Sequence, residues 1–257
     1  MTELTENRAE SQGVKSASRV LIALATYNEI ENIPRLVGEL RGVLPDADVL
    51  VVDDNSPDGT GRWAATASEE DPHVFALIRE NERGLGSAVI RALKYAIEND
   101  YDFVVNMDAD FSHPVAVAPQ LVARMDDEPV VDVAIGSRYV PGGATPDWPL
   151  RRKIMSRCVN AFARLTLGLK TRDNSGAYRC YRVSKLRDLD FSAFVSTGYS
   201  FFEETLFRLR QKKARFAELP IVFVDRQHGV SKINQKEAVR AVMIMTSLGV
   251  KRLFGLR

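Results

Sequence analysis

The sequence contains few of the residues that form cross-links or transition-metal sites. Among its 257 residues there are two cysteines, Cys158 and Cys180, and three histidines at separated positions. Two cysteines without metal-ligand spacing suit a reduced compartment, where such residues usually serve as small buried side chains. We therefore expect neither a disulfide framework nor a zinc site.

Long apolar runs are also missing from this chain. No stretch approaches the roughly 18–20 consecutive apolar residues that a membrane-spanning helix needs. Residues 1–18 are polar, include three Glu, and lack the apolar centre of a signal peptide. We predict a disordered N-terminal lead over residues 1–18, a cytoplasmic protein, and no transmembrane segment.

In each half of the chain, charge of one sign is scarce, although the net charge is only +1. Residues 1–137 carry 11 Lys and Arg against 25 Asp and Glu, whereas residues 138–257 carry 24 against 9. Solvated helix faces explain part of these excesses but not their separation along the chain. The division favours an acidic half that holds a metal and a basic half that meets an anionic partner or surface. We expect no nucleic-acid partner.

Apolar runs and amphipathic stretches alternate regularly through the first half of the chain. The hydrophobic content, 45%, is enough for a substantial core. Strand-like runs, with helix-like stretches between them, occupy residues 20–25, 49–52, 74–78, 103–106 and 131–135. Because strands linked through helices by short connections lie parallel, we predict an α/β fold: a mostly parallel central sheet with helices on both faces. Asn28, with Glu31 three residues later, predicts the capped start of the first helix.

The second half is less regular and richer in basic residues. Its patterns predict a strand over residues 216–224 and helices over residues 148–167, 199–211 and 235–254. The last of these helices mixes apolar with basic residues and is amphipathic. We hypothesise that it contacts the membrane surface, as interfacial amphipathic helices do. A closing helix packed on the core is the alternative.

Two carboxylates, Asp108 and Asp110, follow the fourth predicted strand. A strand that ends in Asp-x-Asp can present both carboxylates at the edge of a sheet. Mg²⁺ and Mn²⁺ favour such a site, with water and substrate phosphates completing their coordination. Taken alone, the pattern is equally typical of a structural turn, because Asp side chains hydrogen-bond to nearby backbone.

Polar segments follow two other predicted strands as well. Thr26-Tyr27-Asn28-Glu29 comes after the first strand and Asp53-Asp54 after the second. Ligands of open parallel sheets lie beyond the carboxyl ends of the strands, so the three segments are expected to meet in one crevice. A Tyr ring can cover a base, and carboxylates can accept hydrogen bonds from ribose hydroxyls or base N–H groups. The convergence favours a metal–nucleotide site over an isolated turn.

Gly84 and Gly86 form a Gly-x-Gly pattern that does not support a dinucleotide site. The dinucleotide fingerprint belongs in the first strand–helix turn and has a third glycine. Here the pattern lies in the third such connection and lacks that glycine. A nicotinamide oxidoreductase is therefore disfavoured, whereas a close approach of the backbone to a nucleotide stays open.

Eight segments carry a resemblance to a known enzyme family. They are Thr26 to Asn32, Val51 to Thr60, Arg83 to Gly86, Met107 to Pro114, Gly136 to Val140 with Gly142-Gly143, Trp148 with Arg152, Gly198 to Phe201, and Asp225 to Lys232. In this order and spacing the chain resembles family 2 glycosyltransferases, and within them the polyprenol-phosphate (dolichyl-phosphate) mannose synthases. The resemblance covers nearly the whole chain, and Ser56-Pro57-Asp58-Gly59-Thr60 is among its most specific parts.

The resemblance implies a nucleotide-diphospho-sugar transferase fold of the GT-A, Rossmann-like type, with GDP-mannose as the leading donor. It implies Mg²⁺ or Mn²⁺ on Asp108 and Asp110. Ser112 stands where some relatives supply a third ligand through an amide, so the third ligand stays open. Ala25 stands where a proline is common. The donor-binding residues implied are Ala25, Tyr27, Glu29, Asp53, Asp54, Asp58, Gly84, Asp108, Ala109, Asp110, Arg226 and Lys232.

The resemblance also implies a polyprenyl-phosphate acceptor, whose phosphate Arg138, Arg152 and Ser156 would hold. The catalytic group implied is Asp108 and Asp110 with Arg138. A phosphate monoester has a second pKa near ~6, so it is mostly a dianion at neutral pH and needs positioning more than deprotonation. Direct in-line attack would convert an α-linked donor into a β-linked product. No general base is then required.

The expected organisation has three parts and one principal activity. The parts are the lead at residues 1–18, a catalytic domain at 19–232 and an amphipathic helix within 233–257. We expect mannose transfer from GDP-mannose to a polyprenyl phosphate at the cytoplasmic face of the membrane, by a peripheral enzyme. A UDP-glucose-dependent polyprenyl-phosphate glucosyltransferase is one alternative. An inactive nucleotide-sugar-binding subunit is another, against which the intact acidic pair argues.

Overall fold

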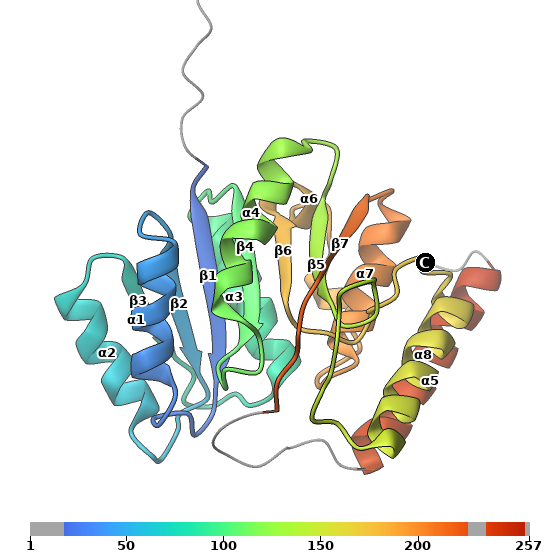
Figure 1. The fold of residues 1–257 in the computed structure, drawn as a ribbon, viewed down its shortest axis with the longest axis horizontal. Coiled ribbons are helices and arrows are strands. Elements are labelled where there is room, and N and C mark those ends of the chain that lie inside the picture. Colours follow the sequence, from blue (N-terminus) through green and yellow to red (C-terminus); the bar gives the residue numbers. More distant parts are fainter. Residues whose placement is uncertain (1–17, 226–234, 255–257) are drawn as a thin grey trace, which may run out of the picture.

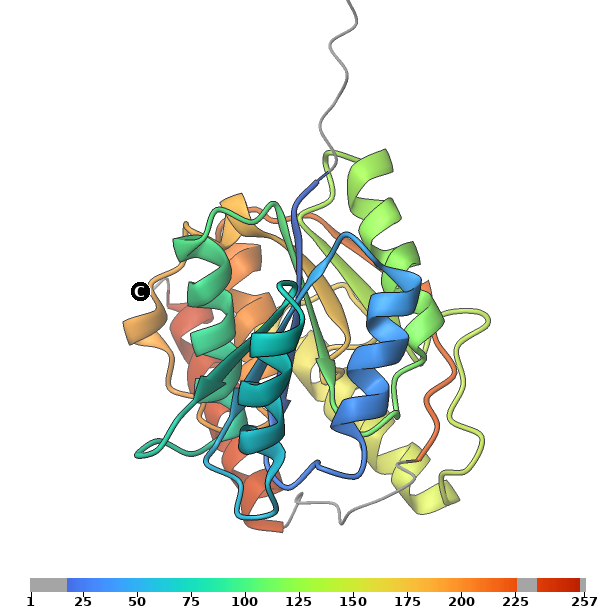
Figure 2. The ribbon, with the colours of Figure 1, turned by 90° about the vertical axis from the view of Figure 1, so that its left-hand side faces the viewer.

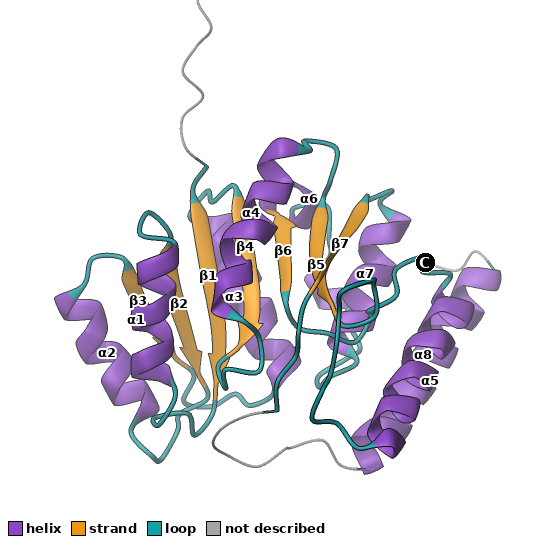
Figure 3. Cartoon of the chain, viewed as in Figure 1, coloured by secondary structure: helices purple, strands orange, loops and turns teal. Residues whose placement is uncertain are grey.

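The computed structural model describes residues 18–225 and 235–254, arranged as a central sheet between two layers of helices (Figures 1 and 3). The strands are β1 (Val20–Thr26), β2 (Asp48–Asp53), β3 (Val74–Ile78), β4 (Phe103–Asp108), β5 (Val133–Ser137), β6 (Arg179–Arg182) and β7 (Phe216–Pro220). The helices are α1 (Ile33–Val43), α2 (Thr60–Glu70), α3 (Leu85–Glu98), α4 (Ala118–Asp127), α5 (Leu150–Leu167), α6 (Val183–Leu186), α7 (Phe201–Gln211) and α8 (Gln235–Leu253). Two 3₁₀ turns are η1 (Val115–Val117) and η2 (Phe191–Ala193).

The strands of the described residues form one sheet in the order β3-β2-β1-β4-β6-β5-β7. Neighbouring strands are parallel except at β6, which runs antiparallel to both β4 and β5. The mostly parallel sheet predicted from the sequence is confirmed. Its parallel strands end at the same edge, the lower one in Figure 1. Ligands of open parallel sheets bind beyond this edge.

Both faces of the sheet are buried, which explains why β1 reads as an uninterrupted apolar run. Its side chains alternate between two cores. Ile22 and Leu24 pack with α1, α2 and α4, whereas Leu21 and Ala23 pack with α3, α5, α7 and α8. The view along the sheet shows these two helical layers on opposite sides of the strands (Figure 2).

The start of α1 differs from the prediction. Asn28 does not cap the helix; it takes a left-handed backbone conformation with φ of 59°. The helix begins at Ile33, with Pro34 in its first turn, and the carbonyl of Glu29 accepts from the backbone N–H groups of Asn32 and Ile33. Proline favours the first helical turn because its fixed φ suits that position and no intrahelical N–H bond is lost there.

Strand β6 was not predicted, and β7 is shorter than predicted. Only Cys180 and Tyr181 are apolar in β6, because an arginine stands at each end. Arg179 is nevertheless fully buried, where it donates to the carbonyls of Asn174 and Phe202. A four-residue segment with an arginine at each end and two apolar residues between them is too short to be predicted as a strand. The extended chain after β7 forms only an isolated bridge, between Val222 and Ala144.

Helices α5 and α8 lie side by side along one edge of the molecule (Figure 1). Met245 and Leu248 of α8 are buried in the core, so this amphipathic helix is packed onto the fold. Other apolar side chains of the same helix, including Val239 and Met243, remain exposed. Within residues 18–225 and 235–254, no helix has both the length and the apolar character needed to cross a membrane.

Candidate active site

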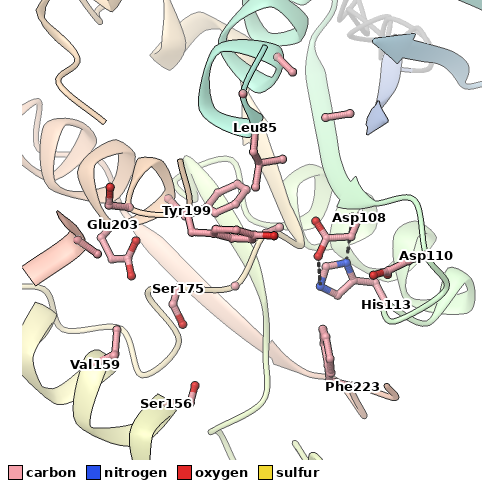
Figure 4. Close-up of a pocket in the computed structure, with 18 of the residues that line it drawn as sticks. Leu85, Asp108, Asp110, His113, Ser156, Val159, Ser175, Tyr199, Glu203 and Phe223 are labelled. Atoms are coloured by element: carbon pink, nitrogen blue, oxygen red, sulfur yellow. Dashed lines mark hydrogen bonds and ion pairs between the residues drawn. The ribbon is translucent and has the colours of Figure 1, made fainter. Parts of the chain in front are cut away.

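A cavity of about 650 Å³ opens at the carboxyl edge of the sheet (Figure 4). One wall comes from the ends of β1, β2 and β4 and from the start of α3. The opposite wall comes from α5, α7 and α8. The three polar segments predicted to converge from the strand ends all contribute to this lining, through Tyr27, Glu29, Asp54, Asp108 and Asp110.

The acidic pair lies where β4 ends. The backbone N–H of Asp108 donates to Nδ1 of His113 at 3.1 Å, and Nε2 of His113 lies 4.0 Å from Oδ2 of Asp108 (Figure 4). Asp110 is 5% exposed, and its Oδ1 accepts from the backbone N–H of Ser112 at 3.0 Å. These bonds fix the turn so that both carboxylates border the cavity.

His113 supports this turn as a neutral imidazole. Burial lowers the pKa of His113 to about 4, against the opposing effect of the Asp110 charge, so the ring is uncharged at neutral pH. The ring also stacks on Tyr178, with 4.9 Å between centroids. Because Nδ1 accepts from Asp108, the ring proton is assigned to Nε2. His113 therefore acts as a positioning residue for Asp108.

The donor set fits a hard divalent cation. Two carboxylates border the cavity, and the hydroxyl of Ser112 in the same turn is buried and has no hydrogen-bond partner among the described residues. In the part of the chain that the structure describes, no three His, Cys, Asp or Glu side chains cluster in a way that could hold a metal. Asp108 and Asp110 would hold Mg²⁺ or Mn²⁺, with water and substrate phosphates completing the coordination.

Four of the residues predicted to bind the donor, Tyr27, Glu29, Asp54 and Gly84, line the cavity. The guanidinium of Arg83 lies over the Tyr27 ring, 5.0 Å from its centroid. Asp54 forms a buried ion pair with Arg79 and accepts from the backbone N–H of Gly84 at 2.8 Å. These bonds hold the loop before α3 against the end of β2.

Two predicted donor-binding residues lie outside the cavity lining. Asp53 is fully buried, and its carboxylate accepts from the hydroxyls of Thr26 and Ser56 at 2.8 and 2.6 Å. Asp58 accepts from the backbone N–H and hydroxyl of Thr60. Both carboxylates organise the turn between β2 and α2. Ala25 and Ala109 do line the cavity, whereas Arg226 and Lys232 lie outside the described residues.

The Gly-x-Gly segment permits a close approach between two backbone segments. A Cβ on Gly84 would lie 3.1 Å from the carbonyl oxygen of Thr197, and one on Gly86 would lie 3.1 Å from the same atom. Gly84 also has a φ of 128°, which side-chain-bearing residues rarely adopt. The glycines thus let the start of α3 pack against the loop before α7.

Arg138 lies on the basic side of the cavity in a buried ion pair. Its Nε and one terminal nitrogen each donate to Asp173 at 2.7 Å, and the same terminal nitrogen donates to Ser175 at 3.0 Å. Burial alone would raise the pKa of Asp173, but the charge and hydrogen bonds of Arg138 hold that pKa below its usual range. Asp173 therefore fixes the guanidinium against the cavity wall.

Arg152 and Ser156 extend this side along α5. The guanidinium of Arg152 lies 3.9 Å from the centroid of Trp148 and donates to Asp225 at 2.6 Å. Ser156 accepts from the hydroxyl of Tyr139 at 2.6 Å. All three predicted acceptor-phosphate residues thus border the same cavity as the acidic pair.

Several lining residues were not foreseen from the sequence. Ser175 follows Asp173 in an irregular segment that shows no periodicity. Glu203 was hidden within the helix pattern of α7, although a charged residue directly after Phe201 and Phe202 on a buried face is a recognisable anomaly. Ala241 and Met245 of α8 line the cavity because α8 packs across its end.

Comparisons with known proteins identify the family of this chain. Residues 21–190 match the family described as glycosyl transferase family 2. The undecaprenyl-phosphate mannosyltransferase of Micrococcus luteus is 43% identical over 240 residues, which cover 93% of this chain and 98% of that protein. The polyprenol monophosphomannose synthase of Mycolicibacterium smegmatis is 37% identical over 241 residues, covering 93% and 89%.

Among solved structures, the fold resembles glucosyl-3-phosphoglycerate synthase from Mycobacterium tuberculosis in complex with Mn²⁺, UDP and phosphoglyceric acid. The TM-score is 0.66 and the identity 17%, over 94% of this chain and 80% of that one. A likeness at this identity shows the GT-A fold alone. The family match covers more than half of the chain and the two mannosyltransferases exceed 30% identity, so this chain is a glycosyltransferase that belongs to family 2.

Proposed function

We propose that this enzyme transfers mannose from GDP-mannose to a polyprenyl phosphate, with inversion, to give polyprenyl-phosphate β-mannose. The names of the two relatives that share 43% and 37% identity support the acceptor and the sugar. The observation that carries the proposal is the composition of one continuous cavity. Its lining combines the acidic pair, the arginines Arg138 and Arg152, and apolar side chains of α5 and α8.

The acidic end suits the donor. Asp108 and Asp110 would hold the metal, while Tyr27, Glu29 and Asp54 lie where a nucleoside would extend from it. The bound divalent cation supplies Lewis-acid stabilisation of the charge that develops on the departing diphosphate. Arg226 and Lys232 are proposed to add positive charge to the same diphosphate.

The basic and apolar end suits a lipid phosphate. Arg138 and Arg152 offer guanidinium groups, and Ser156 a hydroxyl, to an anionic acceptor. Beyond them the lining becomes apolar, through Met155 and Val159 of α5 and Val242 and Met245 of α8. A phosphate held by the arginines would direct an isoprenoid tail between these two helices.

The proposed chemistry needs no general base from the protein. The acceptor phosphate, with a second pKa of about 6, is already mainly a dianion at neutral pH. An oxygen of that phosphate attacks the anomeric carbon as the bond to the diphosphate breaks, and the configuration at that carbon inverts. Arg138 and Arg152 orient the attacking phosphate, and His113 keeps Asp108 in place without exchanging a proton.

The donor can be tested with the purified enzyme. We expect transfer of radiolabelled mannose from GDP-mannose to a polyprenyl phosphate in the presence of Mg²⁺ or Mn²⁺, and little transfer of glucose from UDP-glucose. The product should carry a β-linkage, which NMR coupling of the anomeric proton and carbon reports. Transfer from UDP-glucose alone would replace the mannose proposal with its closest alternative.

We also propose that the enzyme lies on the cytoplasmic face of the membrane through α5 and α8. Leu150 and Ile154 of α5 and Val239 and Met243 of α8 are each more than half exposed. Basic residues, among them Arg151 and Arg240, are interspersed with them. Apolar side chains beside cations favour the interface of an anionic bilayer.

Replacing Ile154 and Met243 together with Asp should weaken binding to vesicles that contain anionic lipids by about tenfold or more, since two apolar contacts are lost and two repulsive charges are gained. Co-sedimentation with the vesicles measures this binding. Val130→Asp is the matched control, because Val130 is 55% exposed but lies before β5, at the opposite edge of the sheet. If the wild type, the double variant and Val130→Asp bind the vesicles equally, α5 and α8 do not contact the membrane.

A further inference from the structure

Glu203 is a buried carboxylate with an unused acceptor atom. The residue lies in the first turn of α7, is 3% exposed and lines the cavity. Its Oε2 has no hydrogen-bond partner within the described ranges. Figure 4 shows Glu203 and Asp108 on opposite sides of the cavity, with Tyr199 and Ser175 between them.

The neighbouring residue shows that this position is unusual. Glu204 is also buried, but its carboxylate accepts from the backbone N–H of Ser196 at 2.8 Å and from Nε of Arg208 at 2.8 Å. A buried carboxylate oxygen without a partner is costly, and one that persists in a native structure requires an explanation. The hydrogen bonds of Glu204 within the fold account for its burial, whereas the described residues supply no partner for Oε2 of Glu203.

Nearby cations do not supply the missing partner. The guanidinium of Arg138 is bonded to Asp173, and that of Arg179 donates to the carbonyls of Phe202 and Asn174. Burial raises the pKa of Glu203 to about 7, and this rise is reduced only in part by a hydrogen bond from its own backbone N–H and by the charge of Arg179. Oε2 of Glu203 can therefore accept a hydrogen bond from a ligand that enters the cavity.

The chemistry of the cavity limits what that donor can be. Phosphates are repelled by a carboxylate, and the groups suited to phosphates are the metal-holding pair, Arg138 and Arg152. A sugar attached to a diphosphate at Asp108 would extend between these groups, toward Ser175 and Glu203. Sugar hydroxyls are hydrogen-bond donors, and carboxylates are strong acceptors for them.

We propose that Glu203 binds the transferred sugar by accepting hydrogen bonds from its hydroxyl groups, and so contributes to the choice of sugar. This inference rests on the proposed function, because it needs a nucleotide-sugar donor in the cavity. A site built around a hydroxyl discriminates against analogues that lack it, since its buried acceptor is then left unpaired. Glu203 is thus a binding residue separate from the metal pair and the acceptor arginines.

Calorimetry with separate ligands tests this role. Measured above pH 7, where Glu203 is mainly ionised, Glu203→Met should leave the affinity for GDP with Mn²⁺ unchanged, while the affinity for GDP-mannose falls by about 10–100-fold, the range expected for a lost hydrogen bond to a charged group. Glu203→Gln should retain part of the affinity, because its amide oxygen still accepts. Among deoxymannose donors, at least one should be rejected by the wild type and tolerated by Glu203→Met.

Thermal stability gives an independent readout. Glu203→Met should raise the melting temperature, because a buried carboxyl oxygen without a partner is removed. The control Glu204→Met should lower the melting temperature, because the backbone N–H of Ser196 and the side chain of Arg208 lose their acceptor. The folded pKa of Glu203 lies above its ordinary value of 4.5, so the native state retains a proton that the unfolded state loses. The stability of the wild type relative to that of Glu203→Met should therefore fall as pH rises from 4.5 to 7.

The outcomes separate the two proposals. If the wild type turns over neither GDP-mannose nor UDP-glucose, the proposed function and the sugar role of Glu203 both fall. If it turns over either donor and Glu203→Met binds that donor as the wild type does, only the inference about Glu203 is overturned. If Glu203→Met lowers the melting temperature as Glu204→Met does, Glu203 stabilises the fold, and the sugar-binding role is overturned.

Discussion

Asp110→Ala should abolish sugar transfer while the chain still folds. Asp110 borders the cavity beside Asp108, and the hydrogen bond that it accepts from Ser112 is confined to the turn after β4. Loss of one of the two carboxylates that we propose hold the metal would remove charge stabilisation from the departing diphosphate. Because a single lost stabilising group costs about 10²–10³ in rate, we expect a fall of at least this size.

The measurement is radiolabelled mannose transfer with Mn²⁺, together with circular dichroism and a thermal melt. Asp110→Asn keeps the volume of the side chain but removes its charge, so it should also be inactive. Asp46→Ala is the matched control, because Asp46 is exposed in the loop between α1 and β2. Full activity in Asp110→Ala, or wild-type activity that persists with a strong chelator, would contradict a metal role for the pair.

The sequence predicts the first half of the fold well because each element carries its own signal. β1 is buried on both faces and appears as an unbroken apolar run, and the strand that ends at Asp108 is recognisable in the same way. The start of α1 was mispredicted because Asn28 and Glu31 satisfy a local capping pattern. Pro34 and the turn around Glu29 decide the helix start instead.

The second half depends on tertiary contacts that leave little trace in the sequence. β6 exists because β4 and β5 flank it and because the charge of Arg179 is met by carbonyl groups from distant segments. Asp173 was not recognised as the partner of Arg138, since the two are 35 positions apart and no periodicity links them. Such pairs form because folding brings distant segments together, so no local sequence pattern predicts them.

Some residues of the candidate site could likewise be predicted from the sequence, and others could not. Asp108 and Asp110 could be singled out from the sequence because adjacent strand ends must meet at one edge of a parallel sheet. Glu203 stands out in the sequence only as a charged residue beside Phe201 and Phe202, and its place at the cavity could not be predicted, because the pattern does not show which face of α7 borders the cavity. A predicted donor residue such as Asp53 shows the converse, since its carboxylate is occupied within its own turn.

Asp173→Ala should destabilise the protein and reduce transfer at the same time. Asp173 is fully buried and accepts two hydrogen bonds from the Arg138 side chain at 2.7 Å, besides backbone bonds from Arg138 and Gly176. Removing one partner of a buried ion pair leaves an uncompensated charge, which costs about 3–5 kcal/mol. Chemical denaturation measures this loss of unfolding free energy, and mannose transfer measures the effect on Arg138.

The pH dependence of stability follows from the same pair. The pKa of Asp173 is lower in the folded state than in the unfolded state, so its contribution is present above the unfolded value, ~3.9, and is lost as pH falls through the folded pKa. Wild-type stability should therefore decline in acid more steeply than that of Asp173→Asn. Parallel acid profiles for the two proteins would contradict a charged role for Asp173.

A double substitution separates stability from function. Arg138→Met with Asp173→Leu removes both charges and fills the space with apolar groups, which should recover much of the unfolding free energy lost in Asp173→Ala. Transfer should remain low in the double variant, because no guanidinium is left at this wall to orient the acceptor phosphate. Arg215→Met, at an exposed arginine on the opposite edge of the sheet, is the control for loss of a positive charge. If the double variant recovered transfer along with stability, Arg138 would serve only the fold, and Arg152 with Ser156 would remain as the acceptor-phosphate residues.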